Sequence, residues 1–552
     1  MASTVTVGFL GGLGEIGRNC AVISQDGAIL IVDCGLMFPN ADMPGVDLVL
    51  PDFTFLHENR EKVVGCVLTH GHEDHTGALS YLLRELSFPL YGSELTLSFA
   101  RNRIEEAGLL AKTRFEVVSD LERRQIGPFT VEFIPVTHSV PSSFALAIST
   151  SQGLILHTGD FKLDLTPVDG RTTELARIGA LAGDPGIRLL LSDSTNAEEE
   201  GFTDSETSVR SALEGLFSRY EERRIVVACF ASHIHRVQQI AEVALAHGRK
   251  VFTLGRSMGK NVALARAQGI LRIPESELVD IEAIGKYKDS EICVISTGSQ
   301  GEPMSALSLM SAGESRWIRV GENDLIIISA DIIPGNESSV GKVIDGLYRR
   351  GTDVAHPGTD HVHASGHARR GELRTMLSVA KPWSFVPVHG EFRHLVNHAR
   401  LAISMGIASD RVLLAQDGDV VVLTDDAITY GDDIPAGYLY VDGVVGDITK
   451  GVLRDRRTLS EDGVVVVAAT VNLTDLELLA DPEVTSRGWI HPEDDELIRE
   501  LQGEARKAIE TTLKGGTRSV DALGRNVRSA VGKKISSTTK RKPMIVPVIT
   551  EI

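Results

Sequence analysis

The residues with the clearest capacity for chemistry lie in one short run, THGHEDHTG, at positions 69–77. The run follows the apolar residues VVGCVL, which predict a buried strand. Imidazole nitrogens and carboxylate oxygens bind borderline divalent ions such as Zn²⁺, and an imidazole must be neutral to do so. His70, His72, Asp74 and His75 place four such groups within six residues, more than one closed tetrahedral site takes from a single turn. We therefore predict two adjacent metal ions.

Other His and Asp residues stand at the ends of further apolar runs. These runs are AILIVD, VEFIPVTH, LILHTGD, RLLLSD and WSFVPVHG, which end at or next to Asp33, His138, Asp160, Asp193 and His389. They predict strands, and amphipathic stretches at 77–86, 206–223 and 235–247 predict helices between strands. Layered α/β proteins bind ligands beyond the carboxyl ends of their strands, so the row of polar side chains predicts one site. His157 lies inside its run and is predicted to pack in the core.

A glycine pattern near the N-terminus suggests a different function. Gly12, Gly14 and Gly17 fit GxGxxG after an apolar strand, and Asp33 ends the next run, as in a dinucleotide-binding oxidoreductase. Such a unit needs a full crossover helix between its two strands. Residues 18–27 leave no room for that helix, and they predict a strand followed by an Asp-Gly hairpin turn. The sequence therefore disfavours a dinucleotide site.

The run at 69–77 resembles the metal-binding signature of the metallo-β-lactamase fold. Matched position by position, this resemblance implies seven metal ligands: His70, His72, Asp74, His75, His138, Asp160 and His389. Asp160 would lie between the ions, and Asp33 would orient the ligand turn. The expected cofactor is two Zn²⁺ per chain, with Mn²⁺ or Mg²⁺ as alternatives, and such ion pairs support phosphodiester hydrolysis by water. Flavodiiron oxygen reductases carry an acid in place of His72, which favours hydrolysis here over redox chemistry.

The region between about 200 and 350 resembles the β-CASP insertion of the nucleic-acid-processing branch of this fold. The resemblance implies that His367 contacts the scissile phosphate and protonates the leaving oxygen. The expected catalytic residues are Asp33, Asp74, Asp193 and His367. The expected substrate-binding residues are Ser232, His233, His235, His363, Ala364, Ser365, Gly366 and His367. For Ser232, His233 and His235, a helix cap with incidental histidines is an equally good interpretation.

A resemblance to the ribonuclease J family extends over nearly the whole chain. It rests on the motifs GGLGEIGRN, TNAEEEG, HASGH and PVHGE and on a C-terminal module. It implies a 5′-to-3′ exonuclease that prefers 5′-monophosphate RNA, has additional endonuclease activity, and acts in mRNA decay and rRNA maturation. It also implies a homodimer or homotetramer and partners in RNA decay. Two alternatives stay open: a metal-dependent small-molecule hydrolase of the same fold, and a non-catalytic RNA-binding scaffold, which the complete ligand set disfavours.

A chain of 552 residues is too long for one hydrophobic core, so several domains are expected. We predict a metallo-β-lactamase αββα sandwich formed by residues 1–200 and 349–430. An α/β β-CASP domain, residues 201–348, would be inserted into it. A linker, residues 431–462, would lead to a small α+β domain at 463–552 that serves oligomerisation or RNA association.

The charge of the chain is unevenly distributed. The net charge of −19 disfavours a polyanionic ligand for the molecule as a whole. Between Lys514 and Lys542, however, nine Lys or Arg residues face one acid, Asp521. This basic segment predicts either an RNA-recruiting surface or a solvated helix face.

Three further features concern cysteines, location and a second cation. The five cysteines are an odd number without a CxxC pair, which indicates neither disulfides nor a thiolate zinc site. The N-terminus lacks the pattern of a signal peptide, and no apolar run reaches the roughly 18 residues of a membrane span, so a cytoplasmic protein without membrane contact is expected. Asp47 and Asp442 suggest a structural cation site such as Ca²⁺, with turn capping as the alternative.

Overall fold

The computed structural model describes residues 4–40, 42–443, 445–446, 448–489 and 495–552. The chain forms two compact units. The first consists of Met1–Phe38 and Val49–Tyr438, and the second of Pro39–Leu48 and Leu439–Ile552. The second unit thus begins earlier than the predicted boundary at residue 463. It includes the short segment 39–48 because the Asp47 N–H donates to the carbonyl of Val441, 2.8 Å away.

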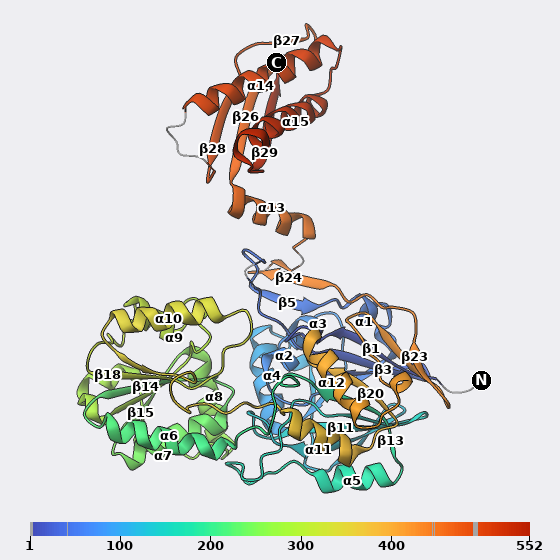
Figure 1. Cartoon of the computed structure of the whole chain (residues 1–552), viewed down its shortest axis with the longest axis vertical. Coiled ribbons are helices and arrows are strands. Elements are labelled where there is room, and N and C mark those ends of the chain that lie inside the picture. Colours follow the sequence, from blue (N-terminus) through green and yellow to red (C-terminus); the bar gives the residue numbers. More distant parts are fainter. Residues whose placement is uncertain (1–3, 41, 444, 447, 490–494) are drawn as a thin grey trace. The chain divides into compact units, whose positions relative to one another are not determined.

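Two β-sheets pack face to face in the first unit (Figure 1). The first sheet has the order β23-β22-β1-β3-β4-β6-β7-β8. Its strands are β1 (Val5–Gly11), β3 (Cys20–Gln25), β4 (Ala28–Val32), β6 (Val63–Val67), β7 (Pro89–Gly92), β8 (Arg114–Val117), β22 (Val420–Leu423) and β23 (Ile428–Tyr430). The second sheet has the order β20-β13-β12-β11-β10-β9. Its strands are β9 (Arg123–Ile126), β10 (Phe129–Val136), β11 (Ser143–Thr150), β12 (Gly153–His157), β13 (Ile187–Asp193) and β20 (Ser384–Val388).

Helices cover the outer faces of this sandwich. Three of them pack on the second sheet: α5 (Leu175–Gly183), α11 (Arg370–Ala380) and α12 (Phe392–Ser404). On the first sheet, α4 (Glu94–Glu106) contacts β7 and β8. Aliphatic and aromatic side chains of both sheets fill the space between them and are almost fully removed from water. The predicted αββα sandwich is therefore confirmed.

The chain leaves this sandwich after β13 and returns to it more than 150 residues later. On its return, β20 pairs in parallel with β13, and β22 pairs antiparallel with β1. Strands from both ends of the sequence thus build both sheets. As a result, the loop after β20 lies beside the loop after β13 (Figure 1).

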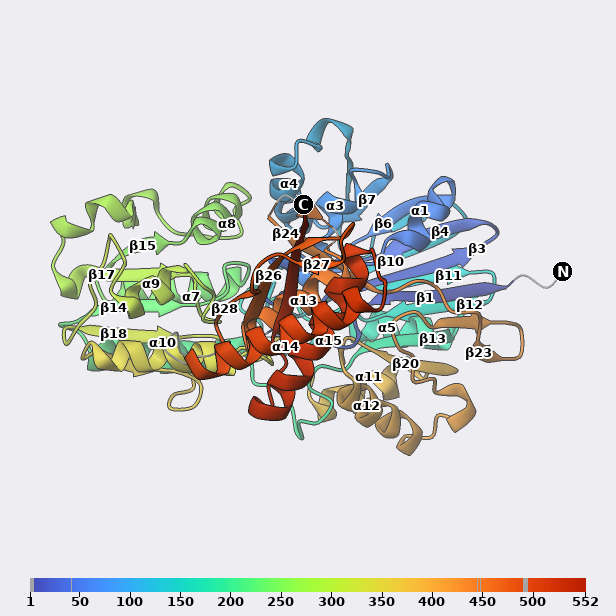
Figure 2. The same cartoon turned by 90° about the horizontal axis from the view of Figure 1, so that it is seen from above.

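The inserted segment forms a parallel sheet with helices on both faces. The sheet has the order β16-β15-β17-β14-β18-β19. Its strands are β14 (Arg224–Ala228), β15 (Lys250–Leu254), β16 (Leu278–Val279), β17 (Ile292–Ser296), β18 (Asp324–Ile328) and β19 (Asp353–Ala355). One face carries α6 (Glu206–Arg219), α7 (Ile234–Ala246) and α8 (Arg256–Ala267), and the other carries α9 (Ala306–Ala312) and α10 (Glu337–Arg349) (Figures 1 and 2). Sheets buried on both faces need apolar runs such as ICVIS and DLIII, which β17 and β18 supply.

The glycine pattern at 12–17 does not belong to a dinucleotide fold. Strands β1 and β3 pair antiparallel, with Thr6 opposite Ser24, so no crossover helix lies between them. Asp26 and Gly27 join β3 to β4 with φ angles of 51° and 77°, as expected for the predicted tight hairpin. The structure therefore excludes the oxidoreductase interpretation of this motif.

The second unit is a small sheet with two long helices on one face (Figure 1). Central strand β26 (Val464–Asn472) pairs antiparallel with β28 (Glu483–Arg487) and parallel with β29 (Met544–Glu551). Helices α14 (Asp495–Lys514) and α15 (Val520–Thr539) bury alternate residues of β26. The amphipathic sequence 492–513 predicts the first of these helices, and residues 492–494 lie outside the described part of the chain. Within the described part of the chain, no helix combines the length and hydropathy needed to cross a membrane.

Candidate metal centre

Loops at the carboxyl ends of five strands converge in the first unit. The loop after β6 contributes the run at 69–77, which continues into the short helix α2 (Glu73–Thr76). His138 and Asp160 lie in the loops after β10 and β12. Asp193 is the last residue of β13, and His389 directly follows β20. The sheet topology thus brings together residues that are more than 300 positions apart in the sequence.

The converging side chains form three overlapping groups that have the composition of metal sites. In each group the ligand atoms lie within 4.8 Å of one another. The groups are His70, His72, His138 and Asp160; Asp74, His75, Asp160 and His389; and Asp160, Asp193, His367 and His389. Asp160 belongs to all three, which is the place expected of a carboxylate shared between ions. All seven residues that the sequence analysis named as ligands are present in these groups.

Hydrogen bonds to the far side of each imidazole fix which nitrogen faces the centre. His138 Nδ1 donates to the carbonyl of Gly366, 2.8 Å away, so the lone pair of Nε2 points inward. His75 Nδ1 likewise bonds to Asp33 Oδ2 at 2.8 Å. Nitrogens of His70 and His72 approach each other to 3.0 Å, and those of His138 and His72 to 3.2 Å. Inward lone pairs held so close together are the arrangement that a cation satisfies.

The charge states of the buried groups also fit a metal centre. Burial lowers the pKa of His70 and His138 well below the usual range and that of His72 to about 4, so these imidazoles are neutral at pH 7. Burial alone would raise the pKa of Asp74, but His75 and His389 beside it hold that pKa far below its usual value. Neutral nitrogens and ionised carboxylates are the forms that bind divalent ions.

The second group shows an excess of negative charge. Burial would lower the pKa of His389, but Asp160, Asp193 and Asp74 raise that pKa to about 10. The pKa of His75 is raised for the same reason, with Asp160 contributing most against burial. Carboxylates that favour protonated imidazoles so strongly provide a field for a cation, and a divalent ion would replace those protons. The residues present therefore fit the metal that the fold implies.

Strained backbone also marks this centre. Asp33 and His389 have φ angles of 59° and 53°, in the left-handed region that non-glycine residues rarely adopt. Each such residue costs about 1–3 kcal/mol and persists only where other contacts fix it. Asp33 is held by the N–H and hydroxyl of Thr69, both at 2.8 Å, and His389 by the hydroxyl of Thr195 at 2.8 Å.

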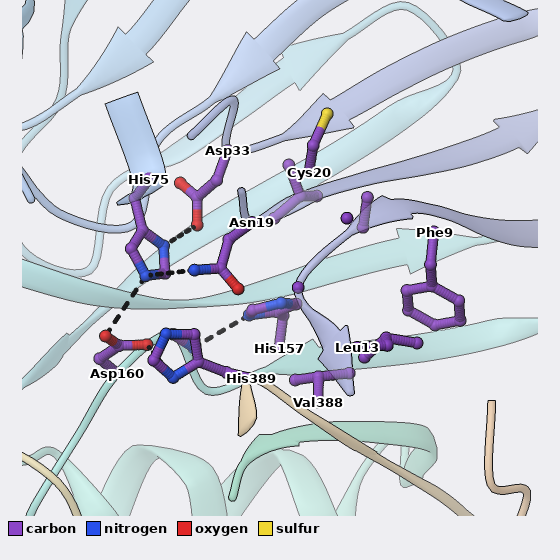
Figure 3. A pocket seen from close by; sticks show the side chains of 15 residues that line it. Phe9, Leu13, Asn19, Cys20, Asp33, His75, His157, Asp160, Val388 and His389 are labelled. Atoms are coloured by element: carbon purple, nitrogen blue, oxygen red, sulfur yellow. Dashed lines mark hydrogen bonds and ion pairs between the residues drawn. The ribbon is translucent and has the colours of Figure 1, made fainter. Parts of the chain in front are cut away.

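Asn19 is a residue at this centre that the sequence analysis missed. Figure 3 shows it beside His75, together with Asp33 and Asp160. Its side-chain amide lies 3.1 Å from His75 Nε2 and 3.3 Å from Asp74 Oδ2, and it donates to the carbonyl of Asp74 at 3.1 Å. A Cβ atom at Gly12 would overlap the Asn19 side chain, so the glycine motif leaves room for this amide. The available signal was the Asn that closes GGLGEIGRN.

Replacing Asn19 by Ala is expected to weaken metal binding at Asp74 and His75. Loss of a partner that orients ligands usually costs 10–100-fold in metal affinity. Calorimetric titration of the metal-free chain with Zn²⁺ measures this directly, and metal content after dialysis gives a second reading. Asn102→Ala on α4 is the matched control. If the Asn19→Ala variant binds Zn²⁺ as tightly as the control, Asn19 does not orient the metal ligands.

His157 lies next to the centre rather than in a fully apolar core. It borders a cavity of about 20 Å³, with Asp33, His75, Asp160 and His389 among its other neighbours (Figure 3). Its Nδ1 accepts a hydrogen bond from the Gly159 N–H at 2.9 Å. Burial lowers the pKa of His157 to about 4, which keeps it neutral. A cavity of this size, with Asp33, His75 and Asp160 on part of its wall, has room for one water molecule.

Successive residues of the HASGH segment, 363–367, are alternately partly exposed and buried. Ala364 and Gly366 are buried, whereas His363, Ser365 and His367 are partly exposed. A Cβ atom at Gly366 would overlap the ring of His138, so this glycine allows close approach to a metal ligand. His367 Nδ1 lies 2.8 Å from Asp193 Oδ2, and its ring centroid lies 5.1 Å from that of His138.

Two side chains that the sequence analysis missed hold this segment in place. Asn196 donates to the hydroxyl of Ser365 at 2.9 Å and to the carbonyl of His367 at 3.1 Å. Thr203 donates to the same carbonyl at 2.7 Å. Asn196 belongs to the TNAEEEG motif and Thr203 lies just after it, but neither residue was assigned a role from the sequence.

The FASHIHR segment, residues 230–236, contains three of the expected substrate-binding residues. His233 is 1% exposed and lies 3.3 Å from Glu206, so it is enclosed within the inserted domain. His235 is 8% exposed and lies 3.1 Å from Asp169 of the sandwich, so it joins the two domains. Ser232 is partly exposed. Substrate contact by these residues stays a prediction, and the burial of His233 beside Glu206 favours the alternative of an incidental histidine.

A buried ion pair lies behind this segment. The guanidinium of Arg236 is fully buried and lies 2.7 Å from Glu206. It also donates to the carbonyl of Val362, the residue before HASGH, at 2.9 Å. Burial alone would raise the pKa of Glu206, but Arg236 and His233 lower it strongly, so the pair is ionised. Arg236 thus connects α6 and α7 to the start of the HASGH segment.

Replacing Arg236 by Leu is expected to destabilise the chain by about 3–5 kcal/mol, because Glu206 would be left buried without its partner. Urea denaturation followed by circular dichroism measures the change. Arg219→Leu at the exposed end of α6 is the control, with an expected change within about 0.5 kcal/mol. The double variant Arg236→Leu with Glu206→Gln should recover part of the loss, and no recovery would mean that the pair is not the cause.

Both acids of the suggested structural cation site have other partners in the structure. Asp442 Oδ2 lies 2.5 Å from the guanidinium of Arg456, and Asp47 Oδ2 accepts from the Gly443 N–H at 2.7 Å. Among the residues that the structure describes, these two acids do not belong to any metal-like group. An arginine therefore balances the charge at this position, and turn capping accounts for Asp47.

Models of protein families match most of the chain. Residues 13–204 match the metallo-beta-lactamase superfamily, and residues 222–347 match the ribonuclease J beta-CASP domain. Residues 357–410 match the Zn-dependent metallo-hydrolase RNA specificity domain, and residues 451–552 the ribonuclease J C-terminal domain.

Characterised relatives are similar over nearly the full length. Ribonuclease J of Synechocystis is 41% identical over 97% of this chain and 85% of its own. Ribonuclease J 1 of Streptococcus pyogenes is 39% identical over 98% of this chain and 96% of its own. The chain belongs to the ribonuclease J family. Ribonuclease J of Mycobacterium tuberculosis H37Rv, 41% identical over 98% of this chain and 96% of its own, is a further relative.

Membership of the ribonuclease J family confirms the main predictions of function. The chain is a metal-dependent ribonuclease, RNA is its substrate, and its architecture combines the metallo-β-lactamase, β-CASP and C-terminal domains. The crystal structure of a protein of unknown function from Enterococcus faecalis V583 shares the fold, with a TM-score of 0.54 and 18% identity. It covers 77% of this chain and 100% of the other.

Proposed function

We propose that this member of the ribonuclease J family degrades RNA as a 5′-to-3′ exonuclease that prefers a 5′-monophosphate, with additional endonuclease activity, in mRNA decay and rRNA maturation. The observation that carries the proposal is the position of His367 and Ser365 beside the metal-like groups. Asp160 and Asp193 lie in one group with His367, so a phosphodiester bound there would meet both acid–base and metal chemistry.

The proposed centre holds two divalent ions, Zn²⁺ with Mn²⁺ or Mg²⁺ as alternatives. The proposed ligands are His70, His72, Asp74, His75, His138, Asp160 and His389. When bound, such an ion pair activates water and stabilises the negative charge on the attacking and leaving oxygens. Asp33 keeps the His75 ring in orientation through its bond to Nδ1.

Proton delivery to the leaving oxygen is assigned to His367. Burial alone would lower its pKa, but the charge and hydrogen bond of Asp193 raise the pKa of His367 above its usual range. Asp193 therefore favours the imidazolium form of His367, with Nδ1–H donating to Asp193 and Nε2–H able to donate to a substrate. Such a group acts as a general acid, which typically contributes 10²–10⁴-fold to a rate.

Substrate contacts are proposed for Ser232, His363, Ala364, Ser365, Gly366 and His367. The side chains of His363, Ser365 and His367 are partly exposed on one side of the HASGH segment. Ala364 and Gly366 would contribute through their backbone, because their side positions face the protein interior. His235 is proposed to act indirectly, by holding α7 against Asp169.

We also propose a homodimer or homotetramer, partners in RNA decay, and a cytoplasmic location. All five cysteines are buried and unpaired, as in proteins of reducing compartments. The proposed domains are the sandwich at 1–200 and 349–430, the β-CASP domain at 201–348, the linker at 431–462 and the C-terminal domain at 463–552. The second unit, which begins at Leu439, supports a C-terminal domain that folds around its own core.

One assay tests the proposed activity. An end-labelled RNA that carries either a 5′-monophosphate or a 5′-triphosphate is incubated with the enzyme, with and without a chelator. Chelator-sensitive release of mononucleotides from the monophosphorylated RNA is expected. Internal cleavage alone, or equal rates on both RNAs, would contradict the exonuclease proposal. No cleavage of either RNA by the metal-loaded chain would favour a small-molecule hydrolase.

A further inference from the structure

A groove in the second unit has no role in the chemistry described above. It lies between helix α15 and the edge strand β29 and has a volume of about 230 Å³. Its apolar side consists of Val520, Pro547 and Ile549, and its polar side of Arg525, Arg528 and Asp521. Gly524 lies between these residues, so α15 places no side chain across the groove at that position. Enclosed small-molecule pockets are usually larger, at about 300–1,000 Å³, which disfavours a small metabolite.

The two arginines of this groove are available to a ligand. Both are exposed, and among the residues that the structure describes neither lies within ion-pair distance of an acid. Arg528 Nε donates to the carbonyl of Ile545 at 3.2 Å, which holds the guanidinium over the groove. Their separation of three residues places them on the same face of α15.

The surroundings of the groove are positively charged although the whole chain carries −19. From Lys514 to Lys542, nine basic residues accompany one acid, and α15 spans most of that segment. Lys534 and Arg541 have acidic partners, Glu500 and Asp462, whereas Arg525 and Arg528 do not. A polyanion therefore gains more from this groove than from the acidic remainder of the chain.

We propose that this groove binds single-stranded RNA and provides a second contact for the substrate outside the metal centre. Arg525 and Arg528 bind successive phosphates, and the apolar side formed by Val520, Pro547 and Ile549 packs against a ribose or base. Guanidinium groups beside an apolar surface are a common way to hold single strands without reading their sequence. The proposal extends the ribonuclease function and assigns its C-terminal domain a role in holding RNA.

The test measures RNA affinity of the full-length chain. A fluorescent single-stranded RNA with a 5′-monophosphate is titrated in the presence of a chelator, which prevents cleavage. The variant is R525E/R528E, and the matched control is R506E/K507E, which makes the same charge change on α14. The groove variant should bind at least about tenfold more weakly at low salt, and its salt slope should fall by about 1.4, the value for two phosphate contacts on a single strand. The control should change neither quantity by that amount.

Further measurements separate the outcomes. R525Q/R528Q repeats the test with a smaller perturbation, and circular dichroism of both variants checks that the domain is folded. Hydrolysis of a small chromogenic phosphodiester should be unchanged, which separates failure of the groove from failure of the metal centre. Equal weakening by the control would mean that only overall charge matters. Unchanged RNA affinity with an altered oligomeric state would assign the groove to a protein contact; either result overturns the proposal.

Discussion

Replacing Asp160 by Ala is expected to abolish RNA cleavage and to remove most of the bound metal. Asp160 contributes to all three metal-like groups, and its carboxylate lies 3.5 Å from His70 Nε2 and 3.3 Å from His75 Nε2. Without it, the imidazoles of both proposed ion sites lose their shared anion. We expect a loss of activity of at least about 10⁴-fold, since loss of the ions removes both water activation and charge stabilisation.

Metal content by mass spectrometry and RNA cleavage by gel assay measure the effect of Asp160→Ala. Asp345→Ala, on the exposed side of α10, serves as a control for loss of one carboxylate. A variant that keeps both ions and most of its activity would show that Asp160 is not shared between them. A variant that loses its ions but keeps its melting temperature would show that the centre is not needed for folding.

Replacing His367 by Ala is expected to slow cleavage by about 10²–10⁴-fold while the metal content remains near that of the wild type. His367 lies at the border of the centre, and its Nδ1 is directed at Asp193 rather than at the group around His70. Loss of this ring removes a proton donor and leaves the seven proposed ligands in place. Cleavage rate and metal content, measured together, therefore distinguish an acid that contacts the phosphate from a metal ligand.

Two comparisons sharpen the His367 experiment. Asp193→Asn should slow cleavage in the same direction, because a neutral amide no longer favours the protonated ring of His367. An RNA with a better leaving group should rescue His367→Ala, since such a group needs less protonation. His57→Ala, outside the metal-like groups, is the control. Equal loss of metal and activity would make His367 a ligand, and absence of rescue would remove its role as an acid.

The expected ligands carry local sequence signals, whereas the residues that surround them in the fold do not. The signature at 69–77 is local, so its four ligands stand out from a single turn. His138, Asp160 and His389 follow strands, and parallel strands in one sheet must end at the same edge. The residues that hydrogen-bond to these side chains are not marked by any sequence pattern. Asn19 reaches His75 across 56 positions, and no local spacing marks an amide that arrives through tertiary packing.

Two of the expected roles depend on partners that the sequence pattern does not show. His233 was expected to contact the substrate because it follows a strand, but it lies 3.3 Å from Glu206 of α6 inside the domain. Asp442 was assigned to a cation, but Arg456 on α13 (Lys450–Asp462) lies one helix away and balances its charge. In both cases the sequence showed the chemical type correctly. The partner that decides the role comes from an element whose placement depends on the whole fold.

The order in which strands enter the sandwich has a consequence for synthesis. His367 and His389 follow the inserted domain in the sequence, although they lie beside ligands from the first third of the chain. A growing polypeptide that stops before residue 384 carries six of the seven proposed ligands and lacks β20, β22 and β23. Each sheet then lacks strands at one end. We therefore expect the growing chain to be without cutting activity until more than two thirds of the protein has been synthesised.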